Sequence, residues 1–173
     1  VPFIQTGLGY STKEGVSSFS AELHGKISLQ KFTVKLQGIY GQNNYDALMI
    51  GSFAAISSDL ATGIQTFKPT ANYSMWTEIE GNGKTWQPGL FMAYSKNLGA
   101  GEDIIPASVA GTRGNIDYLY RVSPRMSYNT GKLRVGLELE YTAGAFGNIG
   151  QTGKIENAVE VGNFRTLMAV FYF

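Results

Sequence analysis

The chain of 173 residues contains no cysteine, and this absence removes several kinds of chemistry at once. Disulfide bridges, thiolate nucleophiles and cysteine-ligated metal sites are all excluded. Histidine is almost absent too, because His24 is the only one. A lone imidazole lacks the partners of a metal site or a hydrolytic triad. We therefore expect no metal, no cofactor and no enzyme activity.

Long apolar runs and an excess of charge of either sign are also missing. The formal net charge is +1, so nucleic acid is not expected as a partner. No segment approaches the roughly 18 apolar residues that a membrane-spanning helix requires. Proline is scarce, with 5 residues, whereas there are 22 glycine, 10 tyrosine and 10 phenylalanine residues. Such a composition favours strands, tight turns and aromatic girdles.

Apolar and polar residues alternate along most of the chain, with the period of two that a β-strand imposes. Over residues 133–143, for example, every second residue is apolar and the other face carries arginine and glutamate. Eight such segments predict eight strands: residues 4–10, 19–29, 32–40, 71–79, 86–94, 116–129, 133–143 and 159–173. In the last segment, the residues predicted to share the apolar face are Val161, Leu167, Ala169, Phe171 and Phe173, with Asn163 and Arg165 among them. Pro88 and Pro124 each remove a ladder hydrogen bond in mid-strand, which predicts a bulge or a site of oligomer contact.

The predicted connections alternate between short and long. Outer-membrane barrels have the same rhythm, with short periplasmic turns and long extracellular loops. Counted back from Phe173, the short joins are 129–132 and 81–84, and the long ones are 144–157, 97–115 and 42–68. The apolar stretch 47–56 is assigned to the loop 42–68, because a ninth strand would break this rhythm and the even number of strands. It would form a hairpin, a lid, a pore constriction or a contact with a neighbouring protomer.

These patterns predict a single all-β domain over residues 1–173, an antiparallel transmembrane β-barrel with eight strands. A water-soluble barrel or sandwich is the alternative, since half-buried sheets alternate as well. Against it, the charged face would have to be buried, and strands of about 9 to 13 residues exceed the usual five or six of globular sheets. Tyrosines also gather near the strand ends, where aromatic girdles lie. The predicted girdle consists of Tyr10, Tyr40, Tyr94, Tyr118, Tyr120, Tyr128 and Tyr141.

The other face of the strands is predicted to line a water-filled pore. Its candidate lining residues are Glu22, His24, Lys26, Lys35, Glu78, Asp117, Arg121, Arg125, Arg134, Glu138 and Glu140. If the end residues of the turn 129–132 pair with each other, Arg121 lies directly across from Glu140. Arg125 and Arg134 then stand together, and their guanidinium groups would attract small anionic solutes. A structural ladder of salt bridges is the alternative interpretation of these charges.

The sequence ends on an aromatic strand, with Phe171, Tyr172 and Phe173 as its last residues. Chain ends in water usually fray and are polar, whereas the last strand of a membrane barrel must pair so that no backbone group stays unsatisfied in lipid. Phe171 and Phe173 are therefore predicted to form a C-terminal signal for the barrel assembly machinery. The predicted location is the outer membrane of a Gram-negative bacterium, in contact with outer-membrane lipid and lipopolysaccharide.

Several short strings run through most of the chain: 37–43 (QGIYGQN), 46–49 (DALM), 94–99 (YSKNLG), 115–118 (NIDY), 120–125 (YRVSPR), 140–143 (EYTA) and 170–173 (VFYF). Together they resemble the C-terminal half of DcaP-like outer-membrane porins. The resemblance implies the last eight strands of a 16-stranded, homotrimeric porin that passes small anionic solutes such as dicarboxylates. The first half would then be missing, as in a proteolytic product or a split barrel. The alternatives are a closed eight-stranded barrel with a structural or adhesive role, and a barrel-borne enzyme.

Overall fold

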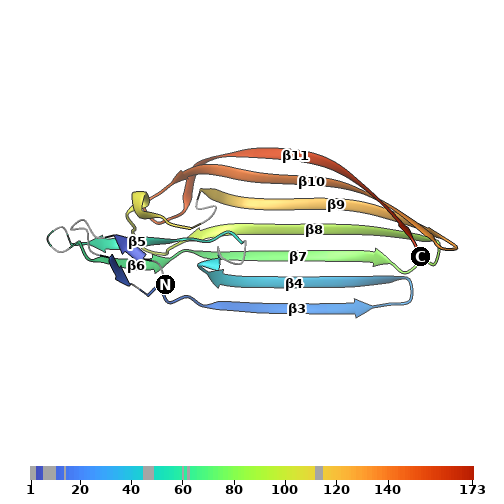
Figure 1. Cartoon of the computed structure of the whole chain (residues 1–173), viewed down its shortest axis with the longest axis horizontal. Coiled ribbons are helices and arrows are strands. Elements are labelled where there is room, and N and C mark those ends of the chain that lie inside the picture. Colours follow the sequence, from blue (N-terminus) through green and yellow to red (C-terminus); the bar gives the residue numbers. More distant parts are fainter. Residues whose placement is uncertain are drawn as a thin grey trace.

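The computed structural model describes residues 3–5, 11–13, 15–44, 49–59, 61, 63–111 and 115–173. Within these ranges the regular structure is all-β apart from short 3-10 segments such as η2 (Pro106–Ser108). A large antiparallel sheet of seven strands is accompanied by two separate two-stranded sheets (Figure 1). In the part of the chain that is described, no helix has the length and apolar character needed to cross a membrane.

The large sheet contains seven of the eight predicted strands. They are β3 (Ser20–Ser28), β4 (Phe32–Gln42), β7 (Ala71–Gly81), β8 (Trp86–Gly99), β9 (Ile116–Thr130), β10 (Leu133–Ile149) and β11 (Ile155–Tyr172). Each strand pairs with the next one in this series, always antiparallel. The edge strands β3 and β11, all of whose residues are described, do not pair with each other, so the sheet is open.

Of the predicted first strand, residues 4–10, the structure describes Ile4 and Gln5, and these two are not part of the large sheet. β1 (Phe3–Gln5) pairs instead with β2 (Ser11–Lys13) in a small sheet of its own. Residues 6–10, and with them Tyr10 of the predicted girdle, lie outside the described residues.

The second small sheet is a hairpin within the connection 42–68. It consists of β5 (Phe53–Ser58) and β6 (Gln65–Pro69). The apolar stretch 47–56 is thus partly a strand, but its partner follows in the same connection. The hairpin lies at the loop end of the large sheet, opposite the short turns (Figure 1).

Most of the buried apolar residues in the described part of the chain lie in the long connections: Ile50, Phe53, Ala54, Ala55 and Ile104. The others, Ile116, Ala143 and Ala145, lie on β9 and β10 of the large sheet. Backbone hydrogen bonds join these connections: Phe53 N–H donates to the Ala110 carbonyl at 3.0 Å, and Ile104 N–H donates to the Gln151 carbonyl at 2.6 Å. The three long connections therefore form one packed unit, the loop core, made of residues 49–55, 104–110 and 150–153.

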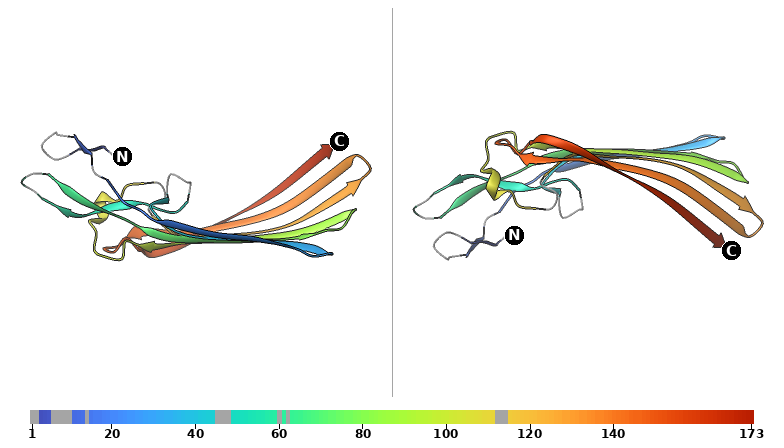
Figure 2. Two further views of the ribbon diagram at one scale, coloured as in Figure 1. Left: turned by 90° about the horizontal axis from the view of Figure 1, so that it is seen from below. Right: turned by 90° about the horizontal axis from the view of Figure 1, so that it is seen from above.

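The seven-stranded sheet has one apolar and one polar face. On the apolar face lie Leu23, Leu36, Met75, Ile79, Met92, Val122, Met126, Leu137 and Met168, all of which remain exposed. The exposed fraction reaches 74% for Leu23 and 70% for Met168. The sheet is curved, and the loop core lies on its concave side (Figure 2). Met49 and Ile50 share a hollow with Trp76 and Arg121 of the polar face, so the polar face is the concave one.

The facing of β11 differs from the prediction. Met168 pairs with Leu137 of the apolar face, and the ring of Phe164 lies 4.7 Å from that of Tyr141. The odd-numbered residues, Phe171 and Phe173 among them, therefore lie on the polar face, and the prediction for this strand was wrong. The odd-numbered and the even-numbered residues of β11 both include apolar side chains, so alternation alone does not determine which set lies on the apolar face. The position of Arg165 determines it, because Arg165 is odd-numbered and lies near Glu140 of the polar face.

The two mid-strand prolines are accommodated without a bulge at either position. At Pro124 the pairing of β9 with β10 is interrupted, but it resumes in the same register on both sides. Pro88 lies beside Gly81, where an added Cβ would come within 2.8 Å of the proline ring. The absent side chain of Gly81 thus makes room for Pro88.

Candidate functional site

A chain of charges crosses the polar face from β4 to β9. The Lys35 ammonium donates to the carboxylates of Glu78, at 2.9 Å, and Glu80, at 2.7 Å. The Arg125 guanidinium pairs with the same two carboxylates from the other side. The two cations and two anions neutralise one another, which offsets the free energy of partly burying them.

Arg125 reaches these carboxylates across an intervening strand, and Gly89 on β8 makes this possible. Gly89 is the direct register partner of Arg125. A Cβ at this position would lie 2.7 Å from Arg125 Nε. The guanidinium therefore passes over a strand whose side chain is missing at the crossing point.

A second cluster joins β9, β10 and β11 around Glu140, of which only 7% is exposed. Arg121 lies 3.1 Å from one carboxylate oxygen, and Arg165 lies 3.9 Å from the other. Arg121 Nε also donates to Thr142 Oγ1 at 2.9 Å. A carboxylate this buried is stable only when it is paired and hydrogen-bonded, and both conditions hold here.

The β9–β10 hairpin is shifted by two residues from the predicted register. Gly131 and Lys132 form a two-residue turn, and Thr130 pairs with Leu133. Gly131 has a φ of 54°, and glycine is favoured at such a position in two-residue hairpin turns. A shift of two leaves every side chain on its predicted face but changes its neighbours across the strands.

This shift changes the partners of the predicted arginines. Arg121 lies across from Thr142 and reaches Glu140 on the diagonal. The predicted pair of uncompensated cations is not present, because Arg125 is neutralised by acids on β7. The charge of Arg134 is not compensated, because in the described part of the chain no carboxylate lies within 4 Å of its guanidinium group. This group donates a hydrogen bond of 3.3 Å to Ser127 Oγ.

The predicted residues on β3 lie on the same face, near its edge. His24 Nδ1 is 3.1 Å from the Glu22 carboxylate, which also accepts a hydrogen bond of 2.8 Å from Gln37. Gln37 in turn accepts a hydrogen bond from the indole of Trp76. Gln37 and Trp76 were not predicted as site residues, although their positions in the alternation place them beside Lys35 and Glu78.

Asp117 is separated from the other predicted acids. Its carboxylate accepts a hydrogen bond of 2.7 Å from the Lys96 ammonium, which lies 5.5 Å from the centre of the Tyr118 ring. Lys96 pairs with Tyr118 across the strands and therefore belongs to the apolar face. The sequence contained a sign of this ion pair, because Lys96 interrupts the series of apolar residues on its face of the strand.

A continuous row of aromatic rings crosses the apolar face near the loop end. Successive ring centres lie 4.7 to 6.4 Å apart, in the order Tyr73, Tyr94, Tyr118, Tyr120, Tyr141 and Phe164. Tyr40 continues the row as the register partner of Tyr73. Glu160 accepts hydrogen bonds from the hydroxyls of Tyr118, at 2.6 Å, and Tyr120, at 3.1 Å. Tyr73, Phe164 and Glu160 were not in the predicted girdle.

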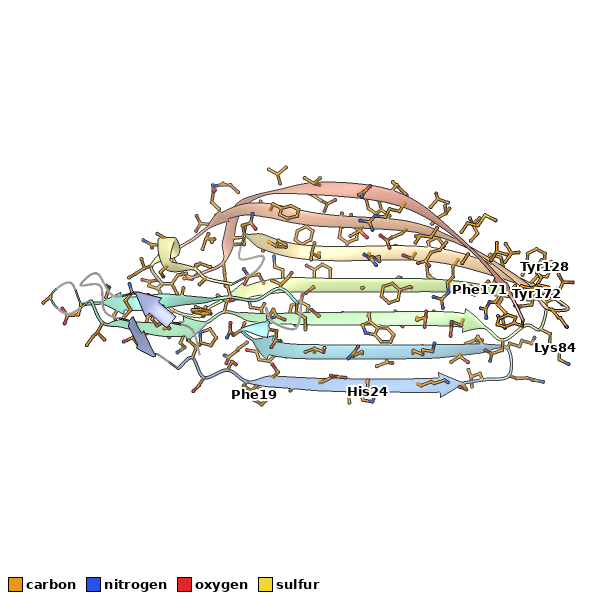
Figure 3. The ribbon with its side chains drawn as sticks, in the orientation of Figure 1. Phe19, His24, Lys84, Tyr128, Phe171 and Tyr172 are labelled. Atoms are coloured by element: carbon orange, nitrogen blue, oxygen red, sulfur yellow. The ribbon has the colours of Figure 1, made fainter. Side chains whose placement is uncertain are left out.

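A second group of rings lies at the turn end of the same face. Trp86 and Tyr128 are in contact, with ring centres 4.6 Å apart, and Tyr172 lies at the same end (Figure 3). Four strands carry one ring of each row, always eight positions apart: Phe32 and Tyr40, Trp86 and Tyr94, Tyr120 and Tyr128, and Phe164 and Tyr172. Eight positions correspond to about 26 Å along a strand. The exposed aliphatic band lies between the two rows.

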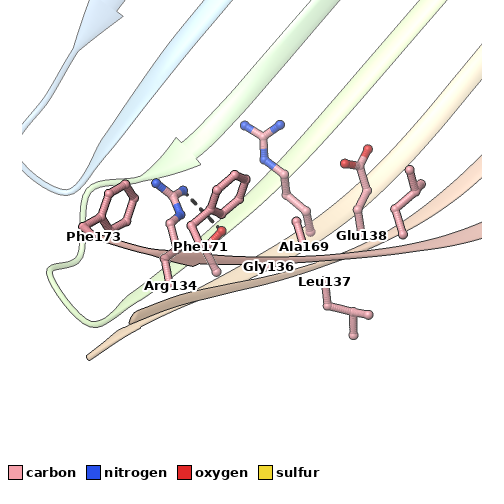
Figure 4. A pocket seen from close by; sticks show the side chains of 10 residues that line it. Arg134, Gly136, Leu137, Glu138, Ala169, Phe171 and Phe173 are labelled. Atoms are coloured by element: carbon pink, nitrogen blue, oxygen red, sulfur yellow. Dashed lines mark hydrogen bonds between the residues drawn. The ribbon is translucent and has the colours of Figure 1, made fainter. Parts of the chain in front are cut away.

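Hollows open at several places on the polar face of the described strands, and two of them lie at opposite ends of the sheet. One, of about 370 Å³, lies at the loop end, where Met49 and Ile50 of the loop core approach Trp76 and Arg121. The other, of about 610 Å³, lies at the turn end beside Phe171 (Figure 4). In the described residues no group of three or more metal-binding side chains is present. No family model, curated protein or solved structure matches the chain.

Proposed function

We propose that the sheet is part of the wall of a transmembrane β-barrel, an outer-membrane porin through which small hydrophilic solutes, mainly anions, diffuse. The observation that carries the proposal is the division of the sheet into an exposed aliphatic band between two aromatic rows and a charged face behind it. This is the arrangement that outer-membrane barrels present to lipid and to water.

The dimensions of the band support contact with lipid. The rows are separated by about 26 Å along the strand, and a tilt of about 40° reduces this to roughly 20 Å along the membrane normal, close to the 25 Å of known barrels. Soluble proteins rarely leave such a large apolar patch open to water. Outer-membrane lipid and lipopolysaccharide would cover the band, and the aromatic rows would lie at the two interfaces.

The edges of the sheet indicate how the barrel would be completed. Unpaired backbone groups at β3 and β11 cannot remain open in hydrocarbon. Both edges would therefore pair with further strands, as they would in one half of a 16-stranded barrel. The polar face, with its paired charges and the loop segment at Met49 and Ile50, would then line and narrow the pore.

Neighbouring residues on opposite faces of β10 provide a direct test of the membrane arrangement. Because the chain lacks cysteine, Leu137→Cys and Glu138→Cys each introduce a single reactive thiol. In outer membranes a charged maleimide should label Glu138→Cys and leave Leu137→Cys unlabelled, while a lipid-soluble reagent should label Leu137→Cys. Equal labelling of both positions by the charged reagent would contradict a lipid-facing band.

The pore itself is tested by conductance. The purified protein should open ion-conducting channels in a planar bilayer, with a higher permeability for chloride than for potassium. A protein with the labelling pattern above but no conductance would be a filled barrel with a structural role. The mobility of unheated samples on a gel would show whether a heat-labile trimer forms.

A further inference from the structure

The larger hollow on the polar face has a composition unlike the rest of that face. It lies between β9, β10 and β11 at the turn end and has a volume of about 610 Å³. Arg134, Phe171 and Phe173 stand together at one end of it, with Glu138 farther along and Leu137 pointing to the opposite face (Figure 4). Arg125 lines the hollow as well, so two guanidinium groups, two phenyl rings and a carboxylate share one space.

Arg134 is the feature of the hollow that requires a partner. Lys35, Arg121 and Arg125 each form ion pairs with carboxylates. Among the described residues, Arg134 has no such carboxylate and holds only a hydrogen bond to Ser127. A guanidinium has five N–H donors in a planar fork that matches a carboxylate. Most of these donors remain available for a ligand.

The two phenyl rings give the hollow an apolar wall. Phe171 and Phe173 are nearly parallel, with 15° between their planes and 6.5 Å between their centres. Gly136 and Ala169 also line the space. At Gly136 an added Cβ would meet nothing closer than Ser127 Oγ at 3.7 Å, so the floor of the hollow is open. A flat apolar group has room to lie against the rings.

We propose that this hollow binds small aromatic monocarboxylates. The carboxylate would lie on the Arg134 fork beside the Ser127 hydroxyl, and the aromatic ring would pack against Phe171 and Phe173. Glu138 lines the same hollow, and its negative charge disfavours a second carboxylate on the ligand. The inference rests on the proposed pore and gives it a solute class.

Calorimetry on the protein in detergent tests the site without requiring conduction. The probes are benzoate, acetate, benzyl alcohol and phthalate, which separate the charge, the ring and the second carboxylate. Benzoate should bind at least about tenfold more tightly than each of the other three, because charge-assisted hydrogen bonds and ring packing act together. Equal binding of acetate and benzoate would overturn the proposal.

Variants of the lining residues identify the site. Arg134→Gln should weaken benzoate binding at least about tenfold, Arg134→Lys should weaken it less, and Phe171→Leu should weaken benzoate more than acetate. Lys132→Gln, which removes a nearby charge in the turn, is the matched control and should bind benzoate as the wild type does. Unchanged benzoate binding in a folded Arg134→Gln protein would also overturn the site.

The proposed function and this inference fail in different ways. If the protein conducts ions but benzoate reduces the current no more than acetate does, the porin function stands and the binding site is excluded. If the protein binds benzoate but does not conduct ions, the binding site stands and the porin function is excluded. Heat-modifiable gel mobility and circular dichroism establish that each variant is folded before either result is used.

Discussion

Arg125 on β9 is ion-paired with Glu80 on β7, although β8 lies between their strands. The contact exists because Gly89 leaves the crossing point empty. Charges on the polar face are thus connected across three strands, and the connection depends on one missing side chain.

Substitution of Gly89 tests this dependence. Gly89→Ala would place a methyl group against Arg125 and displace its guanidinium, leaving Glu78 and Glu80 with one cation instead of two. Because these groups are partly exposed, we expect a loss of about 1–2 kcal/mol in the free energy of unfolding. Urea titration of the protein folded in detergent measures it. Gly136→Ala, where the added methyl meets no close neighbour, is the control, and an equal effect of both changes would contradict the crossing.

The facing of β11 is tested by a second pair of single cysteines. Leu167→Cys lies on the polar face and should react with a charged maleimide in membranes, whereas Met168→Cys lies on the apolar face and should be protected. The alternation of the sequence alone predicted the opposite pattern. Protection of Leu167→Cys with labelling of Met168→Cys would restore that earlier assignment and require a different register for β10 and β11.

The aromatic row near the loop end should contribute to stability. Tyr141 contacts the rings of Tyr120 and Phe164, and it also covers Gly162 on β11. Tyr141→Ala removes these contacts, and we expect a loss of about 1–3 kcal/mol in the free energy of unfolding. Tyr172→Ala is the matched control, because Tyr172 is 79% exposed. The row would have no structural role if the two variants unfolded at the same urea concentration.

The loop core depends on a buried hydrogen-bonded pair. Thr70, which is 2% exposed, accepts a hydrogen bond of 3.0 Å from Ser52 N–H. Thr70→Val leaves this donor unpaired, which costs about 1–3 kcal/mol. Chymotrypsin should then cleave faster after Phe67, which lies in the same hairpin. Thr66→Val, an exposed position of β6, is the control, and equal cleavage rates for the two variants would show that the pair does not hold the loops.

The strands were predictable because alternation with a period of two is a local property. Seven of the eight predicted segments are strands of the large sheet, and their long and short connections follow the predicted order. The facing of β11 was not predictable in this way, since both of its faces contain apolar residues. Contacts with the neighbouring strand β10, such as the approach of Arg165 to Glu140, distinguish the two possibilities.

The register of the strands and the partners of the charged side chains could not be predicted from the alternation either. A two-residue turn at Thr130 and Gly131 and one at Gly131 and Lys132 are both compatible with the alternation, yet the partners on β10 differ by two positions between them. The ion pairs of Arg125 could not be found from adjacent strands either, because its partners lie two strands away. Glu80 was missed because it lies just beyond the predicted end of its strand.

The loop core has a consequence for the order in which the molecule folds. Its hydrogen bonds join residues roughly fifty positions apart in sequence, such as Phe53 with Ala110 and Ile104 with Gln151. Contacts over such separations form only after the intervening hairpins have brought the loops to one end. We infer that the loop core assembles last. It becomes buried only after β4 to β11 have paired with their neighbouring strands. A chain arrested before this step would have most of its strands but loops still open to proteases.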